Sequence, residues 1–520
     1  MYGKMKKYLI DISLIIITLI LTFSVNNPDY DFWHRLAVGS IFFHTGNILK
    51  HDIFSYLPTK ALWIDHEWGS GVVFYFLTSR LGDAGIFILK AFMIFGIFIL
   101  IRKIIELQTR KSVPGVLYFL FLGFALLPGI ANVIRCQMFT YLFFTLWLYA
   151  LEKIKRGKNN FIWIFPATML FWVNLHGGFL AGIGLIIIYA AGELLNRNRY
   201  LKYFGILALI IPVTLINPYG FELWKFIMEA SFMPRPYIPE WYPVSLNGPF
   251  HIIGGVRVHV LAGFMIFALL TVVAGIHLLR REKKPDWTKI FLVTILLYAG
   301  IRHQRHILFL VLAVSGLFYH HYINLFDPVK MFVKNNLSDK LYGTWTLIKN
   351  GSGYVIMGVI LLTIIPQLSA SMTVNPNVYP VGSLEFIKMN NLSGNLATPY
   401  NWGSYALWKL YPQCKILVDG RYEQVYPDDL YDMAIRFSQK NGDWQEILRN
   451  YPADILILSK ATYSPSDVEG LKDWKLVYQD AVSAVVLPKD KVKSFYIYPD
   501  YTNPIYTKED FSRNILLKSR

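Results

Sequence analysis

The chain has 520 residues, of which 54% are hydrophobic and only 16% are charged, and its mean hydropathy is +0.38. This composition excludes a disordered protein and a simple water-soluble enzyme, and it is typical of a protein that crosses a membrane several times. Lys and Arg total 51 against 34 acidic residues, a net charge of +17. In a membrane protein such an excess can record topology rather than a nucleic-acid partner.

Two cysteines in this length exclude a disulfide-rich scaffold and a four-cysteine zinc site. Cys136 lies in an apolar stretch and Cys414 in a distant polar one, so both are interpreted as incidental. At the N-terminus, a basic segment precedes an apolar run at residues 8–25. No small-residue cleavage site follows this run, so the sequence predicts an uncleaved first transmembrane helix rather than a signal peptide.

Ten further apolar runs follow the first one. Because a membrane-spanning helix needs about 20 mostly apolar residues, the sequence predicts a helical membrane protein with about eleven transmembrane helices. The further runs lie at residues 84–101, 113–131, 137–151, 161–175, 179–195, 203–217, 258–279, 288–301, 306–325 and 353–370. The segment 67–81 is interpreted as an interfacial or re-entrant helix, because a span there would disturb the alternation of basic loops.

Basic residues cluster in alternate loops, always on the side of the N-terminus. The clusters lie at residues 4–7, 102–111, 153–158, 197–202, 280–284 and 330–349. The positive-inside rule therefore predicts that this side is cytoplasmic. With an odd number of spans, everything after residue 370 is then extracytoplasmic, and we expect the plasma membrane of a prokaryote.

The last part of the chain, residues 371–520, is polar and rich in tyrosine. Short β-like runs alternate there with helical ones, which predicts an extracytoplasmic α/β domain after a transmembrane module at residues 1–370. The predicted strands are 415–418, 455–458, 476–478 and 484–487, and the predicted helices are 402–410 and 444–451.

The first external loop, about residues 26–83, carries two acidic clusters. Asp29 and Asp31 precede Trp33 and His34, and Asp65-His66-Glu67 follows later. Carboxylates beside an apolar boundary are partly desolvated, which raises their basicity and suits a general base. The alternative is that such loops are polar in any case and that their tryptophans anchor them at the membrane surface.

Three arginines at two other external ends break the positive-inside pattern. Arg302 and Arg305 join two predicted spans, and Arg135 lies near Gln137 at another external end. A guanidinium group matches phosphate oxygens, so an anionic ligand explains these residues. Snorkelling toward lipid headgroups is the alternative for each of them alone.

The remaining external ends carry His176, which precedes two glycines, and Glu240. As an isolated residue, His176 is more often structural than catalytic. The sequence identifies no cofactor. It gives only weak support for a divalent metal, because no HExxH or similarly close ligand spacing is present.

In these motifs the sequence resembles the GT-C superfamily of polytopic glycosyltransferases, in particular bacterial and archaeal members of the protein-mannosyltransferase type. The resemblance covers nearly the whole chain. It rests on Asp31-Phe-Trp-His34, Trp63-x-Asp-His66-Glu67-Trp68, Arg135-x-Gln137, Asn174-x-His176-Gly-Gly-Phe179, Asn217-Pro-Tyr-Gly, Asn401-Trp-Gly-x-Tyr405 and Val418-Asp-Gly-Arg421.

The resemblance implies an inverting enzyme that transfers a sugar from a polyprenyl-phosphate carrier to an acceptor outside the cytoplasmic membrane. The acceptor is a protein, a glycolipid or a polysaccharide, and no nucleic acid takes part. Asp31 is the first candidate for the general base, Asp29 the second, and Glu67 a positioning or second acidic residue. The residues expected to bind substrate are Trp33, His34, His66, Arg135, Gln137, His176, Glu240, Arg302 and Arg305.

Two other functions stay open. A transporter or flippase of an anionic phospholipid or glycolipid would use the same arginines, but it predicts charged residues deep inside several spans. The predicted spans are nearly free of them apart from Lys90. The second of these other hypotheses is a non-catalytic assembly protein whose external domain binds a partner.

Overall fold

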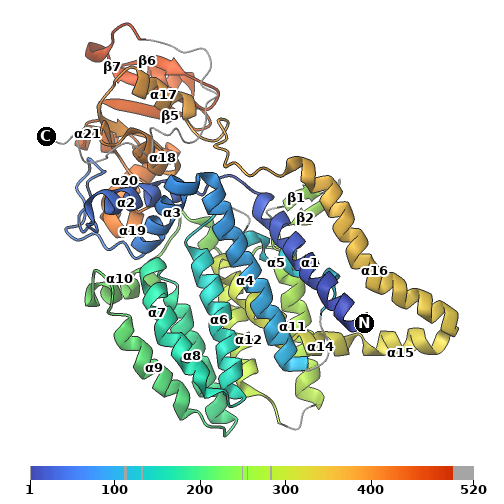
Figure 1. Ribbon diagram of the computed structural model, residues 1–520. Coiled ribbons are helices and arrows are strands. Elements are labelled where there is room, and N and C mark those ends of the chain that lie inside the picture. The colour runs from blue at the N-terminus through green and yellow to red at the C-terminus, as the bar shows by residue number, and fades with distance from the viewer. Residues whose placement is uncertain are drawn as a thin grey trace.

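A helical bundle and a smaller part built around a β-sheet make up the molecule (Figure 1). The computed structural model describes residues 2–109, 114–130, 133–248, 250–253, 256–281 and 284–495. The predicted basic residues at positions 110, 111 and 283, and the end of the predicted external domain at 496–520, lie outside the described residues.

Each of the eleven predicted apolar runs forms a helix. The helices of these runs are α1 (Tyr2–Phe23), α4 (Asp83–Thr109), α5 (Val116–Ile130), α6 (Gln137–Lys155), α7 (Ile164–Leu175), α8 (Phe179–Leu195), α9 (Leu201–Val213), α11 (Ala262–Arg281), α12 (Trp287–Arg302), α13 (Ile307–Leu317) with α14 (Tyr319–Leu325), and α16 (Asp339–Ile364). They are apolar enough to share one large buried core, which joins the bundle to the sheet part.

Fewer helices than the eleven predicted ones have the length and apolar composition of a membrane-spanning helix. Among the described residues, two helices are long and apolar enough to cross a membrane, at Asp83–Thr109 and Asp339–Thr363. A third is added if the pair Gln304–Leu317 and Tyr319–Asn336, bent by 71°, forms one span. The number of about eleven transmembrane helices therefore stays a prediction, and four shorter apolar helices lie among its candidates.

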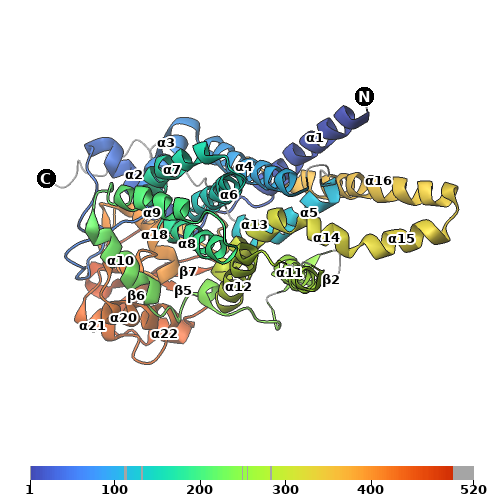
Figure 2. The same cartoon turned by 90° about the horizontal axis from the view of Figure 1, so that it is seen from below.

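Helices α15 (Asp327–Asn336) and α16 extend to one side of the bundle, as Figures 1 and 2 both show. The start of α16 is capped by Ser338, whose hydroxyl accepts a hydrogen bond from the Leu341 amide. Such a cap satisfies one of the free amides of a first helical turn. Many large apolar side chains of α16 are exposed, for example Leu347 and Leu362.

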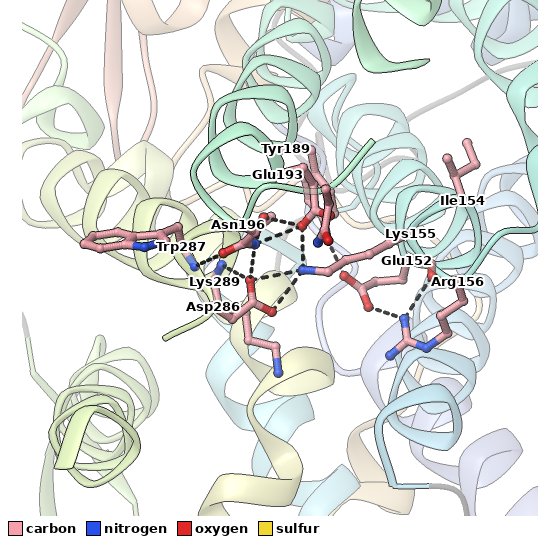
Figure 3. A network of polar contacts seen from close by, with 12 residues as sticks. Glu152, Ile154, Lys155, Arg156, Tyr189, Glu193, Asn196, Asp286, Trp287 and Lys289 are labelled. Carbon is pink, nitrogen blue, oxygen red and sulfur yellow. Dashed lines mark hydrogen bonds and ion pairs between the residues drawn. The ribbon is translucent and has the colours of Figure 1, made fainter. Parts of the chain in front are cut away.

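At the end of the bundle far from the sheet, the ends of three helices are joined by ion pairs and hydrogen bonds (Figure 3). Lys155 Nζ lies 2.8 Å from Glu193 Oε1 and 2.9 Å from Asp286 Oδ2. The Tyr189 hydroxyl donates to Glu152 over 2.8 Å. Helices α6, α8 and α12 are therefore fixed to one another by partly buried polar contacts at this end.

Residues 26–83, which we call the first external loop after their predicted position, contain two helices, α2 (Phe32–Thr45) and α3 (Trp68–Leu81), which pack closely against each other. Gly39 and Gly71 form this contact: a Cβ on Gly39 would lie 2.1 Å from the Gly71 carbonyl oxygen. Only glycine permits such a close approach of two helix backbones. The predicted interfacial or re-entrant segment 67–81 is thus a helix that packs on α2 and leads directly into α4.

The sheet part contains five strands in the order β4-β3-β5-β7-β6. Strands β3 (Gly394–Ala397), β4 (Cys414–Ile416) and β5 (Ile455–Ser459) are parallel, whereas β7 (Ser483–Pro488) is antiparallel to both β5 and β6 (Trp474–Gln479). The four predicted strands are confirmed, and β3 was missed because it is short and contains Gly and Asn. The accompanying helices are α17 (Val381–Met389), α18 (Tyr400–Leu410), α19 (Tyr422–Val425), α20 (Asp428–Gln439), α21 (Glu446–Asn450) and α22 (Pro465–Glu469).

The first external loop and the sheet part are in direct contact. Helix α2 packs against α18 (Figure 1), and an isolated bridge joins Ser55 to Ile416 on β4. Helix α10 (Phe221–Phe232) follows α9, and the following segment passes through a short 3-10 turn at Pro239–Trp241 toward the same region. Three segments distant in sequence therefore meet at one end of the bundle.

Candidate active site

A cavity of about 530 Å³ lies where these three segments meet. Its walls come from the first external loop, the start of α6, the segment before α11, the α12–α13 connection and the sheet part. Among the residues that line it are Asp29, Asp31, Arg35, His66, Glu67, Arg135, Gln137, Tyr237, Glu240, Arg305, Tyr400, Asn401, Gly420, Tyr422, Glu423 and Gln424. Nine of the twelve residues that the sequence analysis selected thus line one cavity or, for His176, the smaller one beside it.

The deepest charged group of the cavity wall is Arg35, on α2. Its guanidinium group forms salt bridges with Asp65 and, over 2.6 Å, with Glu67 Oε2. All three side chains are buried. The Arg35 cation lowers the pKa of Glu67 to about 2, so Glu67 is an ionised carboxylate with a fixed position.

A second charged chain crosses the cavity from the first loop to the α12–α13 connection. Arg135 Nε lies 2.9 Å from Asp29 Oδ2, and Arg135 Nη1 lies 3.2 Å from Glu240 Oε2. The other Glu240 oxygen lies 2.9 Å from Arg305 Nη1. Two arginines therefore share one carboxylate, which leaves part of their hydrogen-bonding capacity for an anion in the cavity.

Asp31 differs from the other acidic residues of the cavity. It makes no salt bridge within 4.0 Å to a basic side chain that the structure describes, although Arg35 and Arg135 lie on its side of the cavity. Burial and the neighbouring Asp29 carboxylate raise the pKa of Asp31 well above its usual value. A carboxylate with raised basicity that is open to a cavity is suited to accept a proton.

Beside this cavity lies a smaller one, of about 210 Å³, with which it shares His66, Gln137, Arg305 and Glu423. His176 lines the smaller cavity, with Nε2 3.2 Å from Glu67 Oε1. The His176 Nδ1 atom accepts a hydrogen bond from the Gly178 amide over 2.8 Å. Burial lowers the pKa of His176 to about 3, so its ring is neutral at physiological pH.

Three of the selected residues lie outside both cavities. Trp33 is fully buried and packs on Tyr405, with ring centroids 4.8 Å apart. His34 Nδ1 lies 3.1 Å from the Ser404 hydroxyl. Both face the sheet part, because α2 presents one side to α18 and the other to the cavity. Arg302 is exposed at the end of α12.

Several cavity residues were missed from the sequence. Arg35 directly follows His34 in a motif that had been selected, and Tyr422 and Glu423 directly follow Arg421 in another. Their position next to these motifs could have identified them as candidates for the cavity. Arg235 carried no local signal: it lies between prolines and stacks on Trp241, with its guanidinium carbon 4.2 Å from the ring centroid.

The acidic and histidine side chains that the structure describes are not grouped as metal ligands are. Among the described residues, no group of three or more His, Cys, Asp or Glu side chains is arranged to hold a metal ion. In the cavity, Asp29, Glu67 and Glu240 each form a salt bridge with an arginine.

The sequence matches no protein-family profile and no curated protein. Among solved structures, the fold is similar to that of the oligosaccharyltransferase of Archaeoglobus fulgidus, determined with a tethered acceptor peptide that contains an NVT sequon. The TM-score is 0.53 at 12% sequence identity, and the match covers 87% of this chain and 69% of the other. The chain therefore has a fold similar to that of this oligosaccharyltransferase.

This likeness covers the bundle and the sheet part together, since 87% of the chain is matched. The predicted architecture of a mostly helical protein with a C-terminal α/β part is therefore confirmed. At 12% identity the likeness concerns the fold alone, so the residues of the cavity must be interpreted from their own geometry.

Proposed function

We propose that this GT-C-like chain is a membrane glycosyltransferase that moves a sugar from a polyprenyl-phosphate carrier to an acceptor at the extracytoplasmic surface. The observation that carries the proposal is the cavity itself, in which the open carboxylate of Asp31 and the arginines Arg135 and Arg305 line one space. Transfer of a sugar away from a phosphate requires a group that accepts the proton of the acceptor hydroxyl and groups that bind the departing phosphate, and this cavity holds both kinds.

Asp31 is the proposed general base. In an inverting transfer, the acceptor hydroxyl attacks the anomeric carbon while the base takes its proton and the phosphate leaves with the electrons of the glycosidic bond. Burial and Asp29 keep the pKa of Asp31 raised, which increases its basicity. Glu67 is the weaker candidate, because Arg35 lowers its pKa to about 2; it is assigned a positioning role.

Arg135 and Arg305 are proposed to receive the carrier phosphate. Negative charge develops on the phosphate as it departs, and guanidinium groups held near it stabilise that charge in the transition state. Glu240, which lies between them, keeps both side chains directed into the cavity. His66, Gln137 and His176 line the space beside Arg305 and are proposed to contact the sugar.

A groove of about 240 Å³ is the proposed route of the acceptor. It shares Tyr237, Tyr422 and Glu423 with the main cavity and continues between the segment before α11 and helix α20. The Tyr422 and Tyr431 rings lie 5.2 Å apart along it. Aromatic rings with a few carboxylates suit an acceptor that combines apolar faces with hydroxyl groups.

We propose the same topology as the sequence predicts, with the N-terminus cytoplasmic and the sheet part extracytoplasmic in a prokaryotic plasma membrane. The cavity and the sheet part then lie on the outer side, and the network around Lys155 lies on the cytoplasmic side. A polyprenyl chain would reach the cavity from the bilayer, so no nucleotide is needed.

A lipid flippase is less well supported. Lys90, a charged residue in the middle of a predicted span, donates to the carbonyl oxygens of Thr22 and Val25 over 3.2 and 3.4 Å. It thereby satisfies carbonyl groups at the end of α1, which is a structural role. A translocation path would instead need polar groups along the bundle.

The direct test is sugar transfer in membranes that contain the chain, with a panel of polyprenyl-phosphate sugars and cell-envelope acceptors analysed by intact mass. We expect Asp31→Asn to reduce transfer by about 100-fold or more, the usual contribution of a general base. Asp473→Asn, at an exposed position outside the cavity, is the matched control.

Wild-type transfer with an inactive, normally folded Asp31→Asn variant would support the proposal. Full transfer by Asp31→Asn would remove Asp31 as the base. Movement of the intact lipid across the membrane, with no sugar transferred from any donor, would favour the flippase.

A further inference from the structure

Arg421 is the most completely buried cation that the structure describes in the sheet part, with a relative exposure of 0%. Its Nε atom lies 2.8 Å from Asp419 Oδ2, and its Nη1 atom forms a salt bridge with Asp52 of the first external loop. Asp52 and Asp419 are equally buried. The guanidinium group thus joins two segments that are 369 residues apart.

Aromatic rings of the first loop enclose the same guanidinium group. Its carbon lies 5.0 Å from the Phe54 ring centroid and 4.8 Å from that of Trp63. Cation–π contacts of this kind gain strength where water is excluded. We call Asp52, Phe54, Trp63, Asp419 and Arg421 the loop–sheet clasp.

Backbone hydrogen bonds extend the clasp on both sides. The Ile416 amide donates to the Phe54 carbonyl over 2.9 Å, and the Tyr56 amide donates to the Ile416 carbonyl over 3.1 Å. The Lys60 amide donates to the Val425 carbonyl over 2.8 Å. The first loop is therefore held along the edge strand β4 by backbone hydrogen bonds around the isolated bridge between Ser55 and Ile416.

Gly420 lies between Asp419 and Arg421 in the chain, and it faces Asp31. A Cβ atom on Gly420 would lie 1.9 Å from Asp31 Oδ1 and 3.1 Å from its carboxyl carbon. Contacts that short do not occur, so any side chain at this position would force the Asp31 carboxylate to rotate. The absence of a side chain at Gly420 is what leaves room for the present orientation of Asp31.

We infer that Gly420, fixed by the loop–sheet clasp, is a positioning residue that sets the orientation of the Asp31 carboxylate in the cavity. The inference rests on the proposed function of Asp31. It assigns the sheet part a share in the reaction, because this part supplies the wall against which the carboxylate lies, and it gives the Val418-Asp-Gly-Arg421 motif a positioning role.

The geometry also explains why the clasp is charged and not apolar. Removing one partner of a buried ion pair leaves an uncompensated charge, which is strongly destabilising. Loop and sheet therefore separate only at a large free-energy cost, which holds Gly420 close to Asp31. A hydrophobic contact would permit sliding, whereas a guanidinium group between two carboxylates fixes direction.

The test is Gly420→Ala in the full-length chain, with transfer measured in membranes. The backbone of Gly420 does not need a positive φ, so alanine adds only its methyl group at the carboxylate. A displacement of a reacting group by about 1 Å lowers the rate about 100-fold. We expect a fall of that order in kcat, little change in KM for the donor, and unchanged thermal stability.

Gly343→Ala is the matched control, because a Cβ atom there meets no heavy atom within 4 Å. A second variant, Arg421→Lys, keeps the charge but reaches only one of its two carboxylates. We expect it to lower kcat and to shift the acidic limb of the pH–rate profile, which reports on Asp31. Overexpressed variants are compared at equal amounts of folded protein, measured by size-exclusion chromatography in detergent.

Wild-type kcat and pH profile in Gly420→Ala would overturn the inference while leaving the proposed function intact. A raised KM with unchanged kcat would also overturn it, since that outcome assigns Gly420 to substrate contact. If wild-type membranes transfer no sugar, the proposed function fails first, and the two failures are thereby distinguished.

Discussion

Arg35 Nη2 and Glu67 Oε2 lie 2.6 Å apart inside the cavity wall, where both side chains are almost completely buried. This pair fixes the start of α3 to α2, and so it holds the two halves of the first external loop together. Because Asp65 contacts the same guanidinium group, one cation balances two carboxylates. The arrangement gives Glu67 a structural role beside its position in the cavity.

We expect Glu67→Gln to destabilise the protein by about 3 kcal/mol, the usual range for breaking a buried ion pair. The melting temperature in detergent is the measurement. Glu222→Gln is the control, since Glu222 pairs with Lys225 at an exposed position, where such pairs contribute about 0–1 kcal/mol. Equal melting temperatures for the two variants would contradict the structural role of Glu67.

The same residue gives the stability a pH dependence. The pKa of Glu67 is lowered from 4.5 to about 2, so its ionised form stabilises the folded state above pH 4.5. This contribution is lost as the pH falls from 4.5 toward 2. The stability difference between wild type and Glu67→Gln should therefore shrink over that range in pH-dependent melting curves; a constant difference would argue against the lowered pKa.

The rate of transfer should depend on pH through Asp31. Burial and Asp29 raise its pKa, and the base acts only when it is ionised. We expect kcat to rise with pH through a value above the ordinary Asp pKa of 3.8. Asp29→Asn removes one cause of the raised pKa, so it should move this limb to lower pH. If the acidic limb of the kcat–pH profile does not move in this variant, the Asp29 carboxylate is not a cause of the raised pKa of Asp31.

Arg302 and Arg305 both lie where α12 leads into α13, and we expect their substitution by Ala to affect donor binding differently. We expect Arg305→Ala to raise KM for the polyprenyl-phosphate donor about tenfold or more, because a hydrogen bond to a charged group contributes about 1.5–3 kcal/mol. Arg302→Ala should change KM little, since Arg302 is exposed and does not line the cavity. Equal effects of both substitutions would point to general attraction of anionic lipid.

Membrane topology can be tested by labelling single cysteines with an impermeant maleimide. The two native cysteines, Cys136 and Cys414, are buried and should react slowly. In intact cells we expect Asp473→Cys to be labelled and Lys158→Cys to be labelled only after permeabilisation; both positions are exposed. The reverse pattern would invert the proposed orientation.

Local patterns determined much of the secondary structure. The apolar runs formed helices where they were expected, because burying apolar side chains requires backbone hydrogen bonds to be satisfied within the segment. The short runs at 455–458 and 484–487 became the central strands β5 and β7 because β-branched and leucine side chains fill a sheet that is covered on both faces.

Site residues were harder to assign. Asp31, Glu67, Arg135, Glu240 and Arg305 were selected for their side on the predicted topology, and they do line one cavity. Trp33 and His34 were selected from the same motif, yet they contact Tyr405 and Ser404. On a helix, neighbouring residues point to different sides, so a contiguous motif cannot tell which of its members face the cavity.

The sequence by itself determined an apolar, helix-forming chain with a polar α/β segment after residue 370 and with acids and arginines gathered at alternate loops. These properties follow from composition and short-range periodicity, which act on neighbouring residues. Only the tertiary structure decided that Arg35 holds Glu67, that Arg421 holds Asp52, and that Gly420 lies against Asp31. Charge pairing depends on distance in space, and segments 369 residues apart have no local pattern that records their contact.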